Sequence, residues 1–213
     1  MLTLYDCATA PSPRRARILL AEKGVAYTAV NVDLRTGEQL TEAYRAINPL
    51  ATVPALKLDE SEGGVVLTDN AAIAAYVEAR HPQPPLMGTT PAEKADIASW
   101  HWRCEFEGLM AIAEALRNSS PAMAHRALPG TANYEQIPAL AERGLARLAV
   151  FFDTLEARLA GRDCVAGTGF SIADITAVVT VDFARVVRVK PGDQHVNLKR
   201  WRAEMARRPS MAM

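Results

Sequence analysis

The chain has 213 residues, of which 49% are apolar and 23% are charged, and its composition is that of a globular protein rather than a disordered chain. Basic and acidic residues number 24 each, so the formal net charge is zero, which argues against a nucleic-acid-binding surface. No apolar stretch reaches the roughly 18–20 residues of a membrane span, and the first residues do not form a secretion signal. Three widely spaced cysteines form no metal-binding pattern. We therefore expect a cytoplasmic protein without a metal.

The pattern of secondary-structure signals changes along the chain. Residues 1–80 alternate between strand and helix signals, whereas residues 91–213 carry helix signals only. Residues 81–90, which lie between them, contain three prolines and favour an extended linker. The sequence thus predicts an α/β domain over 1–80, a linker over 81–90 and an all-α domain over 91–213.

Taken in chain order, the first domain predicts a βαβ unit followed by a ββα unit. The first strand is Leu2–Tyr5, and in the helix that follows Ser12 is a natural N-cap with Pro13 at the first helical position. Gly24 ends that helix. The remaining predicted elements are a strand over 27–33 with Val30 and Val32 on one face, a helix over 41–47, a strand over 53–58, a turn over 59–64, a strand over 65–67, and a helix that begins at Asp69 or Asn70.

The second domain predicts four helices. Thr90 begins a capping box, and its helix should extend to about Asn118 because Pro121 follows. A second capping box, at Ser171, opens an unusually apolar helix that we place at the centre of the domain. The other two helices are one over 138–159, with Leu145, Leu148, Phe152 and Leu155 facing inward, and a last one that contains Leu198 and Trp201.

Several motifs at these spacings carry a resemblance to one family. They are Tyr5-Asp6 followed by PSPRRAR over 11–17, LAEKG over 20–24, Asn48-Pro49 followed by TVPAL over 52–56, LTDNAAI over 67–73, and FSIADI over 170–175. Together they resemble a soluble glutathione S-transferase, and most of all the atypical Gtt2-like bacterial and fungal subgroup. The resemblance implies a thioredoxin-like first domain, in which Pro54 is cis, and a helical second domain.

The resemblance also implies an activity. It is the conjugation of the glutathione thiolate to a small apolar electrophile, with reduction of peroxides as a second reaction and detoxification as the role. Glutathione is then a co-substrate, no metal takes part, and the protein is a homodimer joined through the helices that begin near Asn70 and Thr90. Three departures from the family pattern leave a second interpretation open, a binding or regulatory module with little turnover: Ala10, Gln39 and Asn70. A third interpretation is a thiol–disulfide enzyme that depends on Cys7.

The glutathione site implied by the resemblance lies in the first domain. The main chain of Val53, next to Pro54, pairs with the cysteinyl residue of the tripeptide. Four further residues flank it, with Asp69 and Asn70 at the γ-glutamyl end and Gln39 and Thr52 at the glycyl end. The residues alone allow a simpler interpretation, in which the first two are helix caps and the last two are exposed loop residues.

Activation of the thiol is left open by the sequence. A free thiol has a pKa near ~8.5, and lowering it by about two units takes about 2.7 kcal/mol. The position that usually carries Ser or Cys falls on Ala10, which has no group to offer. Ser12, a held water and Arg117 remain as candidates, although the residues alone favour an N-cap at Ser12 and a surface salt bridge at Arg117.

Other side chains are expected to line a pocket or to pack in the structure. The electrophile pocket is assigned to Pro11, Met110 and Asn118, and Trp102 is expected on a different helix face from the buried Trp100. The electrophile itself is not specified by the sequence. The cysteines are expected to be structural, with Cys7 half-buried and Cys104 and Cys164 in the core, and the histidines are expected in the linker or on the surface.

Overall fold

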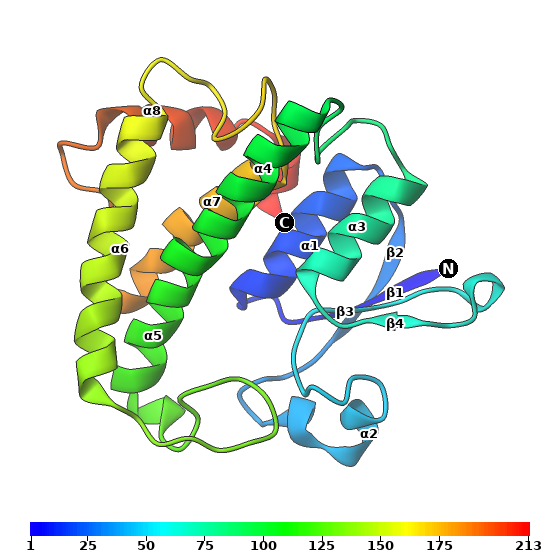
Figure 1. Cartoon of the computed structure of the whole chain (residues 1–213). Helices are drawn as coiled ribbons and strands as arrows, with labels where there is room; N and C mark the ends of the chain where they lie inside the picture. Colours follow the sequence, from blue (N-terminus) through cyan, green and yellow to red (C-terminus); the bar gives the residue numbers. More distant parts are fainter. The chain divides into compact units, whose positions relative to one another are not determined.

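The computed structural model describes all residues from 1 to 213 and divides into two compact units (Figure 1). The first unit comprises Met1–Pro84 together with Pro129–Ala132 and Met213, and the second comprises Pro85–Leu128 and Asn133–Ala212. The main boundary therefore falls inside the segment 81–90. No helix combines the length and the apolar character needed to cross a bilayer.

The first unit is a four-stranded sheet with helices, in the βαβ–ββα order that the sequence predicts. The strand order is β2-β1-β3-β4, with β1 parallel to β2 and antiparallel to β3, and with β3 antiparallel to β4. Helices α1 and α3 lie side by side (Figure 1). The elements are β1 (Leu2–Asp6), α1 (Pro11–Glu22), β2 (Tyr27–Asn31), the 3-10 helix η1 (Glu38–Leu40), α2 (Glu42–Arg45), β3 (Ala55–Lys57), the 3-10 helix η2 (Glu60–Glu62), β4 (Val66–Leu67) and α3 (Asn70–Arg80).

A buried lysine fastens the end of α1 to the end of α3. Lys23 is the C-cap of α1, and none of its side-chain surface is exposed. Its ammonium group lies 2.5 Å from a carboxylate oxygen of Glu78 and donates to the carbonyl oxygens of His81, at 2.8 Å, and Pro84, at 2.5 Å. These three acceptors satisfy the donors that an ammonium group carries, which makes the burial of its charge tolerable.

The second unit is helical, as predicted. Helix α7 is buried along most of its length, from Ile172 to Val181, which places it at the centre of this unit. The elements are α4 (Pro91–Arg103), a π-helical segment η3 (Cys104–Leu109), α5 (Met110–Ser119), the 3-10 helix η4 (Pro121–Met123), α6 (Pro138–Arg158), α7 (Ile172–Phe183), the 3-10 helix η5 (Ala184–Val187), α8 (Val196–Met205) and the 3-10 helix η6 (Pro209–Ala212).

The capping boxes predicted at Thr90 and Ser171 are both present. The second contains Asp174, whose side chain is fully buried. Its carboxylate accepts hydrogen bonds from the Val165 N–H at 2.7 Å, from the Ser171 N–H and hydroxyl at 3.0 Å each, and from the Trp201 indole at 3.3 Å. Burial raises the pKa of the Asp174 carboxyl to about 6, and these donors oppose the rise.

Four expectations from the sequence need correction. Ala10, not Ser12, is the N-cap of α1, and Pro11 takes the first helical position. Val30 is 39% exposed and Val32 1%, because β2 is an edge strand that ends before Val32 turns inward. Leu145 is 42% exposed, because the buried face of α6 is centred on Gly144, Leu148, Phe152 and Leu155. The long helix expected from Thr90 is interrupted by the π-helical segment η3, although it does end at Ser119.

Candidate functional site

Three segments of the first unit meet at the end of the sheet where β3 begins. The Val53–Pro54 bond is cis, as the resemblance implies, and β3 begins directly after it. The antiparallel registers of β3 pair Leu56 with Leu67 of β4 and with Leu4 of β1. Continuing each register by three residues sets Val53 opposite Asn70 on one side and opposite Cys7 on the other. The starts of α3 and of the loop into α1 therefore flank Val53.

The main chain of Val53 is unused within the protein. Neither its N–H nor its C=O forms a hydrogen bond in the structure, and the residue is only half-buried. A main-chain donor and acceptor left open at the end of a strand can pair with an extended peptide. The geometry therefore allows a short peptide to lie along Val53.

Thr52, the neighbour of Val53, is held by two buried side chains. The Tyr44 hydroxyl donates to the Thr52 carbonyl oxygen at 2.7 Å. The Asn48 amide donates to the same oxygen at 2.8 Å and to the Thr52 hydroxyl oxygen at 3.2 Å. Burial raises the pKa of Tyr44 to about 12, which keeps the phenol protonated as a donor. Neither side chain was predicted to belong to the site, although the short polar helix that ends at Asn48-Pro49 points to this segment.

Helix α3 begins at this end of the sheet, and main-chain N–H groups of its first turn are left without an acceptor in the helix. Asp69 is its N-cap and accepts from the Ala72 N–H at 2.8 Å, so the cap that the sequence predicts is present. The N–H groups of Asn70 and Ala71, in the first turn, have no acceptor inside the helix. Together with the positive end of the helix dipole, these groups favour a carboxylate.

Gln39 is buried, which corrects its simpler interpretation as an exposed loop residue. Its side chain is on η1, is 6% exposed, and its Oε1 atom has no hydrogen-bond partner. A buried acceptor without a partner is costly. The structure places no charged group at this position, so any contact with a ligand carboxylate would come through the amide.

The start of α1 offers a hydroxyl but no side-chain cap. No side chain bonds to the first turn, and prolines at positions 11 and 13 remove two of its N–H groups. Ser12 is half-buried, and its Oγ accepts from the Arg15 guanidinium at 3.4 Å. Because its oxygen is the acceptor in that bond, the Ser12 hydroxyl proton remains available to a ligand.

The other predicted site residues belong to the second unit. Arg117 donates to the Arg126 carbonyl oxygen at 2.9 Å and forms no salt bridge, so the surface ion pair allowed by the sequence is not found. Burial, and to a lesser degree the charge of Arg126, lower the pKa of Arg117 from its ordinary value. Asn118 is 6% exposed, donates to the Glu114 carbonyl and accepts from the Ile137 N–H, so its amide fastens the following loop. Met110 is 42% exposed.

The cysteines and histidines do not form a cluster of reactive or metal-binding side chains. Cys7 is 8% exposed, so it is buried rather than half-buried, and its sulfur lies 3.6 Å from the Thr9 hydroxyl. Cys104 is fully buried, as expected. Cys164 is only partly buried, because it lies in the loop before α7, which corrects its assignment to the core. His195 is 4% exposed and bonds to Asp153, which corrects its surface assignment. No three side chains of the metal-binding types lie close enough to hold an ion.

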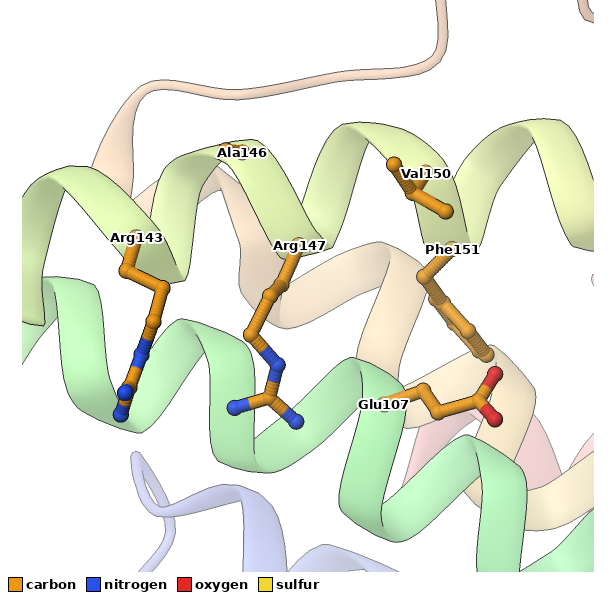
Figure 2. A pocket seen from close by; sticks show the side chains of 6 residues that line it. All are labelled: Glu107, Arg143, Ala146, Arg147, Val150 and Phe151. Carbon is orange, nitrogen blue, oxygen red and sulfur yellow. The ribbon is translucent and has the colours of Figure 1, made fainter.

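A groove of about 330 Å³ lies on the second unit, over α6 (Figure 2). It is lined by Glu107, Arg143, Ala146, Arg147, Val150 and Phe151. Both arginines are already paired with Glu114, at 2.8 and 3.0 Å. None of the residues assigned to the electrophile pocket lines this groove, so it is not that predicted pocket.

Comparison with known proteins decides the family. A model of the glutathione S-transferase N-terminal domain matches residues 9–80, and a model of the C-terminal domain matches residues 119–209. Glutathione S-transferase 2 of Saccharomyces cerevisiae is 32% identical over 99% of this chain and 88% of its own length. The chain belongs to the glutathione S-transferase family.

Solved structures agree with the Gtt2-like assignment. The crystal structure of Gtt2 from Saccharomyces cerevisiae matches with a TM-score of 0.88 at 30% identity, covering 99% of this chain and 98% of that one. A glutathione S-transferase domain-containing protein from Marinobacter aquaeolei also gives a TM-score of 0.88, at 32% identity, covering 98% and 99% respectively. The thioredoxin-like domain and the helical domain are therefore those of this transferase family, as the resemblance implied.

Proposed function

We propose that this Gtt2-like transferase binds glutathione along Val53 and conjugates its thiolate to small apolar electrophiles. In that reaction the thiol loses its proton, the sulfur lone pair forms a carbon–sulfur bond, and the leaving group departs with its electron pair. The same thiolate would reduce a hydroperoxide to an alcohol and water while two glutathione molecules become the disulfide. We also propose that the protein is a cytoplasmic homodimer, formed through α3 and α4, and that it acts in detoxification.

One observation carries this proposal: the open main-chain donor and acceptor of Val53 lie between the starts of two helices. The first turn of α3 supplies N–H groups for the γ-glutamyl carboxylate, and Asp69 supplies a negative charge for the neighbouring ammonium group. The α1 side supplies the Ser12 hydroxyl for the sulfur. A tripeptide with a carboxylate and an amine at one end and a thiol in the middle matches this order of groups.

The test is binding and turnover by the full chain. Glutathione should bind to the protein in isothermal titration calorimetry. With 1-chloro-2,4-dinitrobenzene and glutathione, the protein should form the conjugate faster than the reaction without protein. Absence of both binding and turnover contradicts the proposal. Binding without turnover of any electrophile would favour the second candidate, a binding module, which the lack of a side-chain function at Ala10 favours.

The effect of the Asp69 charge on glutathione binding can be measured separately from the role of Asp69 as the N-cap of α3. Asparagine is as good an N-cap as aspartate, so Asp69→Asn should leave thermal stability nearly unchanged while glutathione affinity falls about tenfold, because the ammonium group loses its counter-charge. Calorimetric titration measures the affinity. Glu60→Gln, an exposed acid on η2, serves as the control and should bind as the wild type does. Equal affinity of Asp69→Asn and the wild type would show that Asp69 acts only as a cap.

Ser12 can be tested as the activator of the thiol. Ser12→Ala should raise the pKa of bound glutathione by about one unit, since one hydrogen bond to the thiolate is lost, and lower kcat/KM about tenfold below that pKa. The pH profile of kcat/KM gives the value, and Thr9→Val, which removes a hydroxyl from the same loop, is the matched control. An unchanged profile would leave Arg117 or a held water as the activator, and Arg117→Met would then distinguish these two.

A further inference from the structure

The carbonyl oxygen of Thr52 already accepts two hydrogen bonds, whereas its hydroxyl group can still donate one. Its carbonyl oxygen receives two donors, the Tyr44 hydroxyl at 2.7 Å and the Asn48 amide at 2.8 Å, which occupy both lone pairs. Its hydroxyl oxygen receives the Asn48 amide at 3.2 Å. The carbonyl can therefore accept nothing further, whereas the hydroxyl still has its proton to give.

The direction of the Asn48 amide is decided by its surroundings. Asn48 is fully buried, and its Oδ1 accepts from the Leu50 N–H at 3.0 Å. Its other end faces the Thr52 carbonyl, which can only accept, so that end must be the NH₂ group. An NH₂ group that points at a hydroxyl oxygen excludes the opposite arrangement, in which the hydroxyl would donate inward.

The side chain of Thr52 lies next to the open main chain of Val53. If the γ-glutamyl end of glutathione lies at the start of α3 and its cysteinyl residue lies along Val53, the third residue continues past Val53 toward Thr52. The glycyl residue ends in a carboxylate, which accepts hydrogen bonds strongly. A hydroxyl that is committed to donate matches this acceptor.

We propose that Asn48 is a positioning residue of the glutathione site, which acts by committing the Thr52 hydroxyl proton to the glycyl carboxylate. This inference rests on the proposed function. Asn48 touches no substrate atom; its effect passes through Thr52, so the two residues should be energetically coupled. The specificity that results is for the tripeptide over the dipeptide γ-glutamylcysteine, which lacks the glycyl residue.

The experiment is calorimetric titration of the full chain with two ligands, glutathione and γ-glutamylcysteine. Thr52→Val removes the hydroxyl at nearly constant volume, whereas Thr52→Ser keeps it. Asn48→Asp replaces the NH₂ donor with a carboxylate oxygen, toward which the Thr52 hydroxyl would turn its proton. Tyr44→Phe is the matched control, because it removes a donor to the Thr52 carbonyl but leaves the hydroxyl bond in place. Circular dichroism checks that each variant is folded, and Asn48→Ser, which adds no charge, replaces Asn48→Asp if that variant unfolds.

The expected result is a change of selectivity. Thr52→Val and Asn48→Asp should each weaken glutathione binding about tenfold and change γ-glutamylcysteine binding less than twofold, while Thr52→Ser and Tyr44→Phe keep the wild-type ratio of the two affinities. The double variant should be no weaker than Thr52→Val alone. The inference is overturned if Asn48→Asp weakens both ligands equally, or if its effect adds in full to that of Thr52→Val. Wild-type protein that binds neither ligand would overturn the proposed function instead.

Discussion

Replacing Asp174 with alanine is expected to lower the free energy of unfolding by about 3–5 kcal/mol. The carboxylate is fully buried and accepts four hydrogen bonds, which come from the chain before α7, from its capping box and from α8. Without it those donors remain buried and unsatisfied. Urea unfolding at pH 7, followed by far-ultraviolet circular dichroism, measures the loss. Asp163→Ala is the control, because that side chain is exposed and pairs only with Arg200, and it should cost less than about 0.5 kcal/mol.

The same carboxyl should make stability depend on pH. Its pKa is raised to about 6 in the folded protein from 3.8, so folding favours the protonated form. The stability that protonation of this group adds is therefore fully present below about pH 4 and is lost as the pH rises through 6. Asp174→Asn does not titrate, so its deficit relative to the wild type should shrink by up to about 3 kcal/mol between pH 4 and pH 7. A deficit that grows over this range would contradict the expectation.

Lys23→Met should lower the free energy of unfolding by about 3 kcal/mol, because the substitution leaves two carbonyl groups and the Glu78 carboxylate without their shared donor. Methionine has nearly the same length, so little packing is lost. Chemical unfolding of the full chain measures the change. Lys57→Met is the matched control: Lys57 is partly exposed, pairs with the exposed Glu60 at 3.3 Å, and should contribute less than about 0.5 kcal/mol. If the two substitutions lowered the free energy of unfolding equally, the buried ammonium group of Lys23 would not stabilise the contact between α1 and α3.

Local signals were enough to predict most of the fold. The capping boxes at Thr90 and Ser171 mark helix starts because the reciprocal bonds involve residues only three apart. The βαβ–ββα order was predicted from the sequence pattern, the cis bond before Pro54 was implied by the resemblance, and both are present. The N-cap of α1 was misplaced, since a helix with prolines at positions 11 and 13 can begin at either one, and only the surrounding structure decides between them.

The site was less predictable, because its geometry depends on contacts between segments. The resemblance pointed to Val53 and Asp69 but not to Asn48, whose bonds to Thr52 depend on a loop that returns Thr52 to its amide. The burial of Gln39 and His195 was likewise missed, since polar residues in loops are normally exposed and only tertiary packing buries these two. On α6 the predicted inward positions of Leu148, Phe152 and Leu155 were right, but Leu145 was not, because Gly144 faces α5, where a Cβ atom would lie 2.6 Å from the Ala111 carbonyl oxygen.

The most direct measurement is a crystal structure of the protein with glutathione bound. We expect that the cysteinyl residue of the tripeptide pairs with both main-chain groups of Val53, at N···O distances of about 2.7–3.2 Å, with its γ-glutamyl carboxylate at the first turn of α3. Glutathione bound with the N–H and C=O of Val53 still open to solvent would contradict it.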